Sequence, residues 1–261
     1  MKFKYYQVDS FTNEIFKGNP ACVVQLNNWL DDDLLLKIAQ ENAVAETAFF
    51  ISNGETFKLR WFTPDIEIDL CGHATLATAF VIKTCVDNKL DKITFETMSG
   101  ILRVDIINDT YFLDFPSRIA IPSDLPIEIE KSLNLQPIEI YKSRDYLLIY
   151  KNQSAVENIL INRNYFDKIN LGYGGVIVSS IGNKSDFVSR FFTPQATILE
   201  DPVTGSSHCS LIPYWSKKLN KNEMIATQLS KRSGLLKCQN MKDRVKIGGK
   251  AVLYSFGEFN I

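Results

Sequence analysis

The segment RWFTP at residues 60–64 decides the fold, because it occurs a second time as RFFTP at residues 190–194. Another pair of segments follows in the same order, SGIL at residues 99–102 and SGLL at residues 233–236. Thr-Pro and Ser-Gly are common in turns, so either match alone is weak. Two matches in one order, each separated by about half of the chain length, instead indicate an internal duplication. The sequence therefore predicts two related lobes built on one plan.

A central helix is predicted in each lobe, between the two repeated segments. The first half has CGHAT at residues 71–75, and the second half has TGSSH at residues 204–208. Residues 72–86 are apolar or small almost throughout, which is typical of a helix that is buried on all sides. The second lobe repeats this element from residue 205 to about residue 217.

The rest of each lobe has the composition of β-strands. In the first half, β-branched and aromatic residues are concentrated between turn-forming residues, which predicts strands over residues 5–9, 21–25, 48–52, 57–62, 92–97, 102–107 and 111–115. Acidic residues 31–33 are expected to begin a helix that runs to about residue 42. The predicted fold class is α+β, with two similar lobes, each a mainly antiparallel barrel-like β-sheet around one central buried helix.

The boundary between the lobes is expected where prolines accumulate. Four of the nine prolines lie within residues 116–137, a stretch that resists regular structure apart from a short helix over residues 127–133. We place the first lobe at residues 1–117, with Glu46 and His73, and the second at residues 118–261, with Asp201 and Ser206. This assignment allows the last strand to cross back to the first lobe.

Composition excludes several classes of protein. The chain has 261 residues, 45% hydrophobic and 23% charged, which is ordinary for a soluble globular protein. The formal net charge of −1 predicts neither a nucleic-acid partner nor an anionic membrane surface. No apolar run approaches the ~20 residues of a membrane span. The five scattered cysteines and the absence of a secretory leader favour reduced thiols and a cytoplasmic location.

The only two histidines, His73 and His208, fall at the start of the two predicted central helices. Either one could be an ordinary hydrogen-bonded polar residue at a helix end. However, the amino terminus of a helix also presents free N–H groups and a partial positive charge, which suit a carboxylate or a phosphate. If a pseudo-two-fold axis relates the lobes, both helix ends would face one cleft. The expected ligand is therefore a small anionic molecule.

Glu46 is a candidate acid/base catalyst. It is a single carboxylate among apolar neighbours, at the junction of a predicted helix and a predicted strand. Burial disfavours the charged form of a carboxylate, and an acid/base catalyst near neutral pH requires such an environment. The alternative is a junction residue that points outward while its neighbours point inward. The residues alone do not decide between these two interpretations.

The segment EDPVTGSS at residues 200–207 precedes the second central helix. Asp201 could cap this helix or hold a substrate, and capping alone would explain its presence. Thr204 and Ser206 offer hydroxyl groups beside free N–H groups. Neither nucleotide-binding glycine motifs nor a nucleophile elbow occur. The cysteine and histidine spacings match no zinc site, so no metal is expected.

Several segments together resemble the phenazine-biosynthesis PhzF-like family in order and spacing. They are GNPA at residues 18–21, ETAF at residues 46–49, FTP at residues 62–64, CGHAT at residues 71–75 and EDPVTGS at residues 200–206. The match extends over essentially the whole chain. The resemblance implies the diaminopimelate-epimerase fold, with two similar lobes and the site between them.

The resemblance also implies an isomerase that uses neither a cofactor nor a metal. In the characterised phenazine enzyme, a glutamate moves a proton between carbons of a dihydro-hydroxyanthranilic acid, and Glu46 occupies the place of that glutamate. His73, Asp201 and Ser206 fall on family positions that hold the polar groups of the substrate. Gly72 and Gly205 would let the backbone approach the ligand, with Thr204 beside them. The implied partner is a small carboxylate, and relatives often form homodimers.

Two alternatives remain open at the level of sequence. The first is a small-molecule binding protein that keeps the fold without turnover, because fold alone does not determine function. The second is an amino-acid racemase or epimerase, because related enzymes use one cysteine from each lobe. Cys71 lies where one such thiol could be, but the second lobe has Thr204 near the partner position, which disfavours this chemistry.

Overall fold

The strands of the first half pair in an alternating parallel and antiparallel order. In the computed structural model, which describes residues 1–261, β2 (Asn19–Gln25) is parallel to β3 (Glu46–Asn53), and β3 is antiparallel to β4 (Thr56–Phe62). Strand β4 is in turn parallel to β6 (Lys92–Thr97), which is antiparallel to β7 (Gly100–Ile107). Each parallel step requires a crossover, and a helix lies in each crossover.

The second half repeats this order of pairing. Strand β11 (Tyr146–Ile149) is parallel to β12 (Val176–Ile181), which is antiparallel to β13 (Phe187–Phe192). Strand β13 is parallel to β15 (Glu223–Gln228), which is antiparallel to β16 (Gly234–Asn240). The same four-step topology in both halves confirms the predicted fold class of two similar sheet-and-helix lobes.

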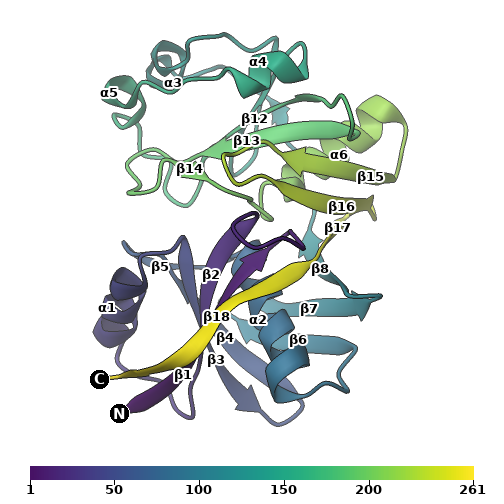
Figure 1. Ribbon diagram of the computed structural model, residues 1–261. Helices are drawn as coiled ribbons and strands as arrows, with labels where there is room; N and C mark the ends of the chain where they lie inside the picture. Colours follow the sequence, from purple (N-terminus) through teal and green to yellow (C-terminus); the bar gives the residue numbers. More distant parts are fainter. The chain divides into compact units, whose positions relative to one another are not determined.

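Two compact units contain these strands. The first comprises residues Met1–Phe115 and Ile247–Ile261, and the second comprises Pro116–Lys246. In the first unit, the long last strand lies beside the first strand, and the two ends of the chain lie close together (Figure 1). The remaining strands are β1 (Lys2–Ser10), β5 (Glu67–Ile68), β8 (Thr110–Pro116), β9 (Ile121–Pro122), β10 (Glu139–Lys142), β14 (Glu200–Asp201), β17 (Arg244–Gly249) and β18 (Ala251–Asn260).

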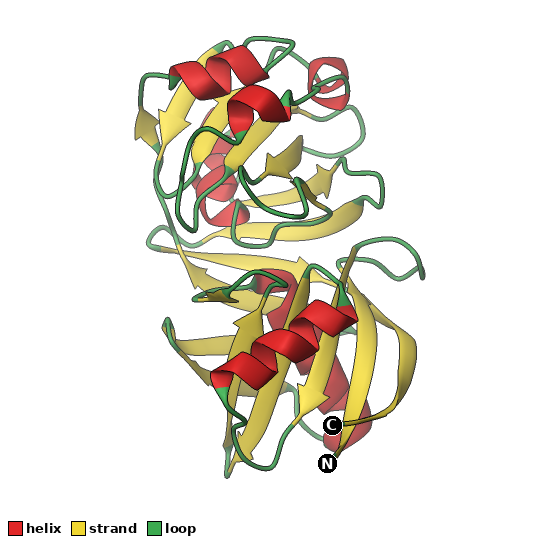
Figure 2. Cartoon of the chain, turned by 90° about the vertical axis from the view of Figure 1, so that its left-hand side faces the viewer, coloured by secondary structure: helices red, strands yellow, loops and turns green.

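The central helix of the first unit is α2 (Gly72–Val81), which continues as a π-helical turn, η1 (Ile82–Val86). It packs against β1, β2 and β3, and nearly all of its side chains are buried. Its threonines are tolerated there because their hydroxyls donate to carbonyls one turn earlier, as Thr78 does to Ala74 at 2.7 Å. Helix α1 (Asp32–Asn42) instead lies on the outside of the sheet, while α2 runs behind the strands (Figure 2).

The central helix of the second unit is α6 (His208–Leu219). Trp215 anchors it, because the indole stacks on Phe187 of β13 and donates to the hydroxyl of Ser179 on β12 at 2.9 Å. The sequence predicted that this helix begins at residue 205, which is wrong. Residues 205–207 form a tighter turn, in which the amides of His208 and Cys209 bond to carbonyls three residues back. The short helices of this unit are α3 (Ile127–Ser132), α4 (Gln153–Glu157) and α5 (Arg163–Phe166).

The repeated segment that revealed the duplication makes the same contacts in both units. Arg60 on β4 binds both carboxylate oxygens of Glu67 on β5, at 2.7 and 2.6 Å. Arg190 on β13 binds Glu200 on β14 in the same manner, at 2.7 and 2.9 Å. Each guanidinium also lies over the phenylalanine two residues later. The Arg-x-Phe pattern, present in both copies of the segment, therefore marks an ion pair that joins two neighbouring strands.

Two sequence expectations about the whole chain can be compared with the structure. All five cysteines are free thiols, as their scattered positions predicted. None of the helices has both the length and the apolar character that are needed to cross a lipid bilayer.

Candidate functional site

Four residues of the first unit form a buried cluster at the start of α2, which we call the Glu46 cluster: Asn19, Glu46, Cys71 and His73. Glu46 is the first residue of β3, and β2 pairs with it so that Ala21 lies opposite Glu46. Because β2 begins at Asn19, the parallel pairing brings Asn19 to the same end of the sheet. The side chain of Glu46 is 14% exposed and that of His73 is 2% exposed. The interpretation of Glu46 as an outward-pointing junction residue is therefore wrong.

His73 lies at the centre of the cluster and uses both ring nitrogens. Its Nε2 lies 2.9 Å from Oε2 of Glu46, and its Nδ1 lies 3.0 Å from Nδ2 of Asn19. In the neutral ring, Nδ1 accepts from the amide of Asn19, and the contact of Nε2 with Glu46 is an ion-pair distance without hydrogen-bond geometry. A half-turn of that amide would present its oxygen to a protonated Nδ1. The Asn19 side chain can therefore serve both protonation states of the imidazole.

The electrostatic surroundings favour a charged His73. Burial by itself lowers the pKa of His73, but the neighbouring Cys71 sulfur and the Glu46 carboxylate outweigh burial and raise this pKa well above its ordinary value. The result is a carboxylate and an imidazole in contact and shielded from water. Such a pair can accept, hold and return a proton, which is the chemistry of a general acid/base catalyst.

Cys71 completes the cluster but does not make it a metal centre. Its sulfur, the Glu46 carboxylate and the His73 ring lie within 4.8 Å of one another, which is close enough to hold an ion in principle. However, Sγ of Cys71 lies 3.6 Å from Nδ1 of His73, whereas Glu46 contacts Nε2 on the opposite side of the ring. The shortest contacts of Cys71 and Glu46 are thus with different nitrogens of the ring, which does not favour a single shared ion. Burial and the Glu46 carboxylate also raise the pKa of the Cys71 thiol to about 11, so it stays protonated.

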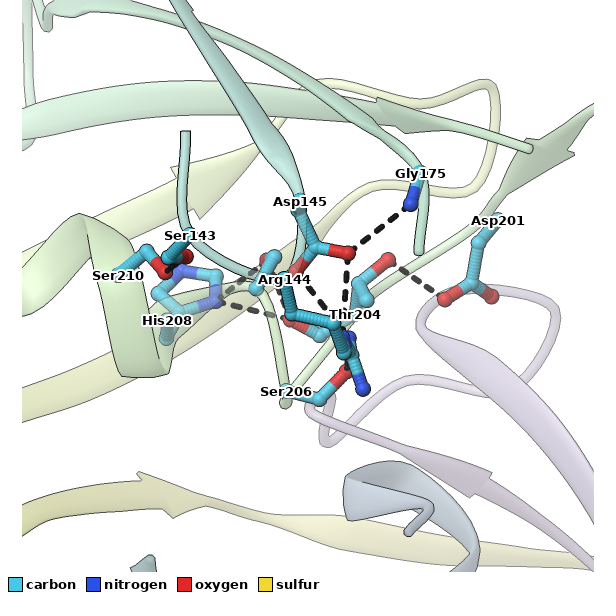
Figure 3. Close-up of polar contacts among 10 residues, drawn as sticks. Ser143, Arg144, Asp145, Gly175, Asp201, Thr204, Ser206, His208 and Ser210 are labelled. Atoms are coloured by element: carbon cyan, nitrogen blue, oxygen red, sulfur yellow. Dashed lines mark hydrogen bonds and ion pairs between the residues drawn. The ribbon is translucent and has the colours of Figure 1, made fainter. Parts of the chain in front are cut away.

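The second unit has its own polar group at the turn before α6, which we call the Ser206 cluster: Arg144, Asp145, Asp201, Thr204 and Ser206 (Figure 3). Asp201 ends β14, and its Oδ2 accepts a hydrogen bond of 2.5 Å from the hydroxyl of Thr204. Ser206 lies two residues further along, and its side chain accepts from Nη2 of Arg144 at 3.0 Å. The structure thus brings Asp201 and Thr204 together and joins Ser206 to Arg144.

Sequence reasoning missed residues that support both clusters. Asn19 belongs to the GNPA segment but received no role, and Arg144 and Asp145 lie in a short segment without any recognisable motif. Gln228 is fully buried, and it accepts from the amide of Thr204 and donates to the carbonyl of Asp201, both at 2.8 Å. A buried glutamine that bonds to both ends of a loop fixes its conformation. No local sequence signal indicates Arg144, because its contact with Ser206 depends on the tertiary structure.

The two histidines of the central helices turn out to be different. His208 is fully buried, its ring lies against Phe187, and its Nδ1 bonds to the carbonyl of Thr204 at 2.9 Å. Burial lowers the pKa of His208 to about 4, although the carbonyl bond opposes this shift. His208 is therefore a neutral core residue, which is the ordinary hydrogen-bonded role that the sequence left open for either histidine.

The chain is similar to known proteins over essentially its whole length. Residues 8–257 match the family model described as phenazine biosynthesis-like protein. A protein of Pseudomonas aeruginosa that is named an uncharacterized isomerase is 42% identical to this chain over the full length of both. A crystal structure of a phenazine biosynthesis protein of the PhzF family from Enterococcus faecalis is 43% identical, covers both chains completely and has a TM-score of 0.94.

The chain belongs to the PhzF-like, phenazine biosynthesis-like family. A structure of a probable proline racemase from Agrobacterium radiobacter has a TM-score of 0.66 at 9% identity, and covers 99% of this chain and 93% of its own. That likeness concerns the fold alone. It agrees with the diaminopimelate-epimerase-like architecture that the sequence predicted.

Proposed function

We propose that this protein is a cofactor-independent isomerase that moves a proton between carbons of a small metabolite bearing a carboxylate. The observation that carries this proposal is the contact between Oε2 of Glu46 and Nε2 of His73, made at 2.9 Å in a nearly solvent-free cluster. Relatives named as isomerases support the reaction class.

In this mechanism Glu46 is the catalytic residue. Its carboxylate removes a proton from one carbon of the bound substrate and returns it to another, so that no net proton is gained or lost. His73 holds the carboxylate in one orientation and stabilises its charge before the first transfer and after the second. Low exposure of both side chains keeps most bulk water away from the reacting carbons, while the 14% exposure of Glu46 allows the carried proton to exchange with a solvent deuteron.

The remaining predicted site residues bind the substrate in our proposal. The backbone N–H of Gly72 lies at the beginning of α2, where anions are stabilised, and that of Gly205 lies in the tighter turn before α6. Thr204 and Ser206 provide hydroxyls, and Asp201 binds a donor group of the substrate. The hydroxyl of Thr204 already donates to Asp201, so the proton of that hydroxyl is committed while its oxygen can still accept.

Racemisation by two thiols is less well supported. It requires a readily formed thiolate at Cys71, whereas the pKa of this thiol is raised to about 11. The equivalent position of the second half is Thr204, which cannot act as a thiol partner. The single carboxylate of Glu46 needs no such partner.

Solvent deuterium incorporation tests the proposal. Wild type and Glu46→Gln are incubated in deuterated water with a panel of dienoic and amino acids that includes a dihydro-hydroxyanthranilic acid, and substrate mass is followed. We expect Glu46→Gln to lower the rate of incorporation about 100-fold or more. The matched control is Glu41→Gln, which makes the same change at an exposed carboxylate of α1 and should keep the wild-type rate. An undiminished rate in Glu46→Gln would remove this residue from the mechanism.

A further inference from the structure

The contacts of Arg144 within the structure use only some of the hydrogen-bond donors of its guanidinium. It lies between β10 and β11. Its guanidinium donates two hydrogen bonds to the carboxylate of Asp145, from Nε to Oδ1 at 3.2 Å and from Nη2 to Oδ2 at 3.1 Å. Asp145 is fully buried, whereas the side chain of Arg144 is 20% exposed. Nη2 also donates to the hydroxyl oxygen of Ser206 at 3.0 Å, and Figure 3 shows Ser206 beside the guanidinium. The guanidinium is thus held rigidly by its inner edge.

The outer edge of this guanidinium remains available. An arginine has five N–H donors, of which the contacts to Asp145 and Ser206 use those on Nε and Nη2. The two donors on Nη1 make no hydrogen bond in the structure. A buried or half-buried donor usually finds a partner, and a fixed guanidinium with a free edge suits a planar carboxylate.

The duplication places Arg144 next to a site position. In the first unit Arg60 lies opposite Phe49, which pairs with Val24, five residues after Asn19. In the second unit Arg190, the counterpart of Arg60, lies opposite Val178, which pairs with Leu148. Five residues before Leu148 is Ser143, so Arg144 directly follows the counterpart of Asn19.

Asn19 and Arg144 make similar contacts in their two units. Asn19 contacts His73, and Arg144 contacts Ser206. His73 directly follows Gly72, and Ser206 directly follows Gly205. In each unit, one side chain at or next to the start of a strand thus contacts the side chain that directly follows the glycine. The first unit uses this arrangement to hold the imidazole beside Glu46, and the second unit uses it to place a cation beside Ser206.

We propose that Arg144 is a substrate-binding residue whose free guanidinium edge binds the carboxylate of the substrate, with Asp145 as the positioning residue that fixes its orientation. This inference rests on the proposed function, because it assumes that the ligand is a small carboxylate. The hydroxyl of Ser206 accepts from Arg144 and keeps its own hydrogen, which can be donated to the same carboxylate. Arginine and serine then act as one binding unit.

A matched pair of ligands separates this role from a purely structural one. 2-Aminobenzoate and 2-aminobenzamide have nearly the same size, but only the first is charged, so their affinities are compared by titration calorimetry at pH 7. We expect wild type to bind the acid at least about tenfold more tightly than the amide. Arg144→Gln should lose about tenfold in affinity for the acid and keep its affinity for the amide.

Two further variants and a control complete the experiment. Arg144→Lys keeps the charge without the planar fork, so its affinity for the acid should be intermediate. Arg163→Gln makes the same substitution in an exposed ion pair with Asp167 of the same unit and should bind both ligands as wild type does. Thermal unfolding of each variant verifies that it is folded.

The outcomes distinguish this inference from the proposed function. Equal losses for acid and amide in Arg144→Gln, or no preference for the acid in wild type, would overturn the role of Arg144. Glu46→Gln should keep the preference for the acid while it loses deuterium incorporation. Full incorporation by Glu46→Gln together with a preference for the acid that depends on Arg144 would overturn the isomerase mechanism and leave the carboxylate site standing.

Discussion

The two histidines show how the same side chain acquires opposite properties from its immediate surroundings. His73 has a carboxylate at 2.9 Å, which stabilises its charged form and raises its pKa in spite of burial. His208 has only a backbone carbonyl and an aromatic ring beside it, so burial dominates and lowers its pKa to about 4. Position at the start of a buried helix does not by itself determine the charge of a histidine. The nearest ionisable partner does.

The depressed pKa of His208 predicts a specific dependence of stability on pH. A histidine with a pKa of about 4 in the folded state binds its proton far less readily than in the unfolded state, where the pKa is about 6.5. Its contribution to stability is therefore complete above about pH 6.5 and is lost as the pH falls towards 4. Replacement by glutamine, which does not titrate, removes this loss.

Urea unfolding at pH 7 and at pH 4.5 measures the effect. Between pH 7 and pH 4.5, we expect the free energy of unfolding of wild type to fall by about 2–3 kcal/mol more than that of His208→Gln. The carboxylates and His73 titrate in both proteins, so their contributions cancel in the comparison. Parallel losses in the two proteins would mean that His208 does not stay neutral in the folded state.

At the scale of elements, the turn between β1 and β2 determines where Asn19 lies. Gly18 has a φ angle of +64°, and a Cβ atom there would lie 2.1 Å from the carbonyl oxygen of Ser10. Ser10 in turn donates to the carbonyl of His73 at 2.8 Å. The glycine therefore allows the chain to turn tightly against the beginning of α2.

Two glycine substitutions separate the cost in stability of a positive φ angle from the cost of a steric clash with the added Cβ atom. Gly54, in the turn between β3 and β4, has a φ of +70° but no atom within 4 Å of its added Cβ. Gly54→Ala should therefore cost only the left-handed conformation, about 1–2 kcal/mol. Gly18→Ala should cost at least about 1–2 kcal/mol more, because the backbone must also shift. Denaturant unfolding compares the two, and equal losses would contradict the close contact with Ser10.

The sequence predicted most of the elements because their signals are local or repeated. The strands over residues 57–62 and 92–97 and the helix from residue 72 were found with accurate ends, since periodicity and composition change sharply there. Helix α6 was placed three residues too early because Gly205 resembles Gly72, whereas residues 205–207 form a tighter turn. Local pattern does not distinguish these two kinds of helix beginning.

The candidate site was predictable only where a residue stands out from its neighbours. Glu46 is a lone carboxylate among apolar residues, and His73 is one of two histidines. Arg144 and Asp145 have no such signal, because arginine beside aspartate is common on protein surfaces. Their importance follows from the burial of Asp145 and from the contact of Arg144 with Ser206, both of which are tertiary properties.

At the scale of the whole molecule, the first unit is built from both ends of the chain. Strand β18 pairs antiparallel with β1 along nearly its whole length, from Lys2 opposite Asn260 to Ser10 opposite Ala251. The other edge of β1 pairs with β2, which carries Asn19. The final strand therefore supports the Glu46 cluster although it contributes none of its residues.

This arrangement predicts that removal of residues 251–261 inactivates the protein without removing a site residue. Without β18, strand β1 becomes an unpaired edge and loses the aromatic contact between Phe3 and Phe259. Hydrogen-exchange mass spectrometry should show loss of amide protection in β1 and β2, together with loss of deuterium incorporation into substrate. The control is Phe256→Ser, a side chain that is 73% exposed, which should preserve both because the strand pairing remains. Protected β1 amides in an active truncated chain would show that the first unit is complete without its last strand.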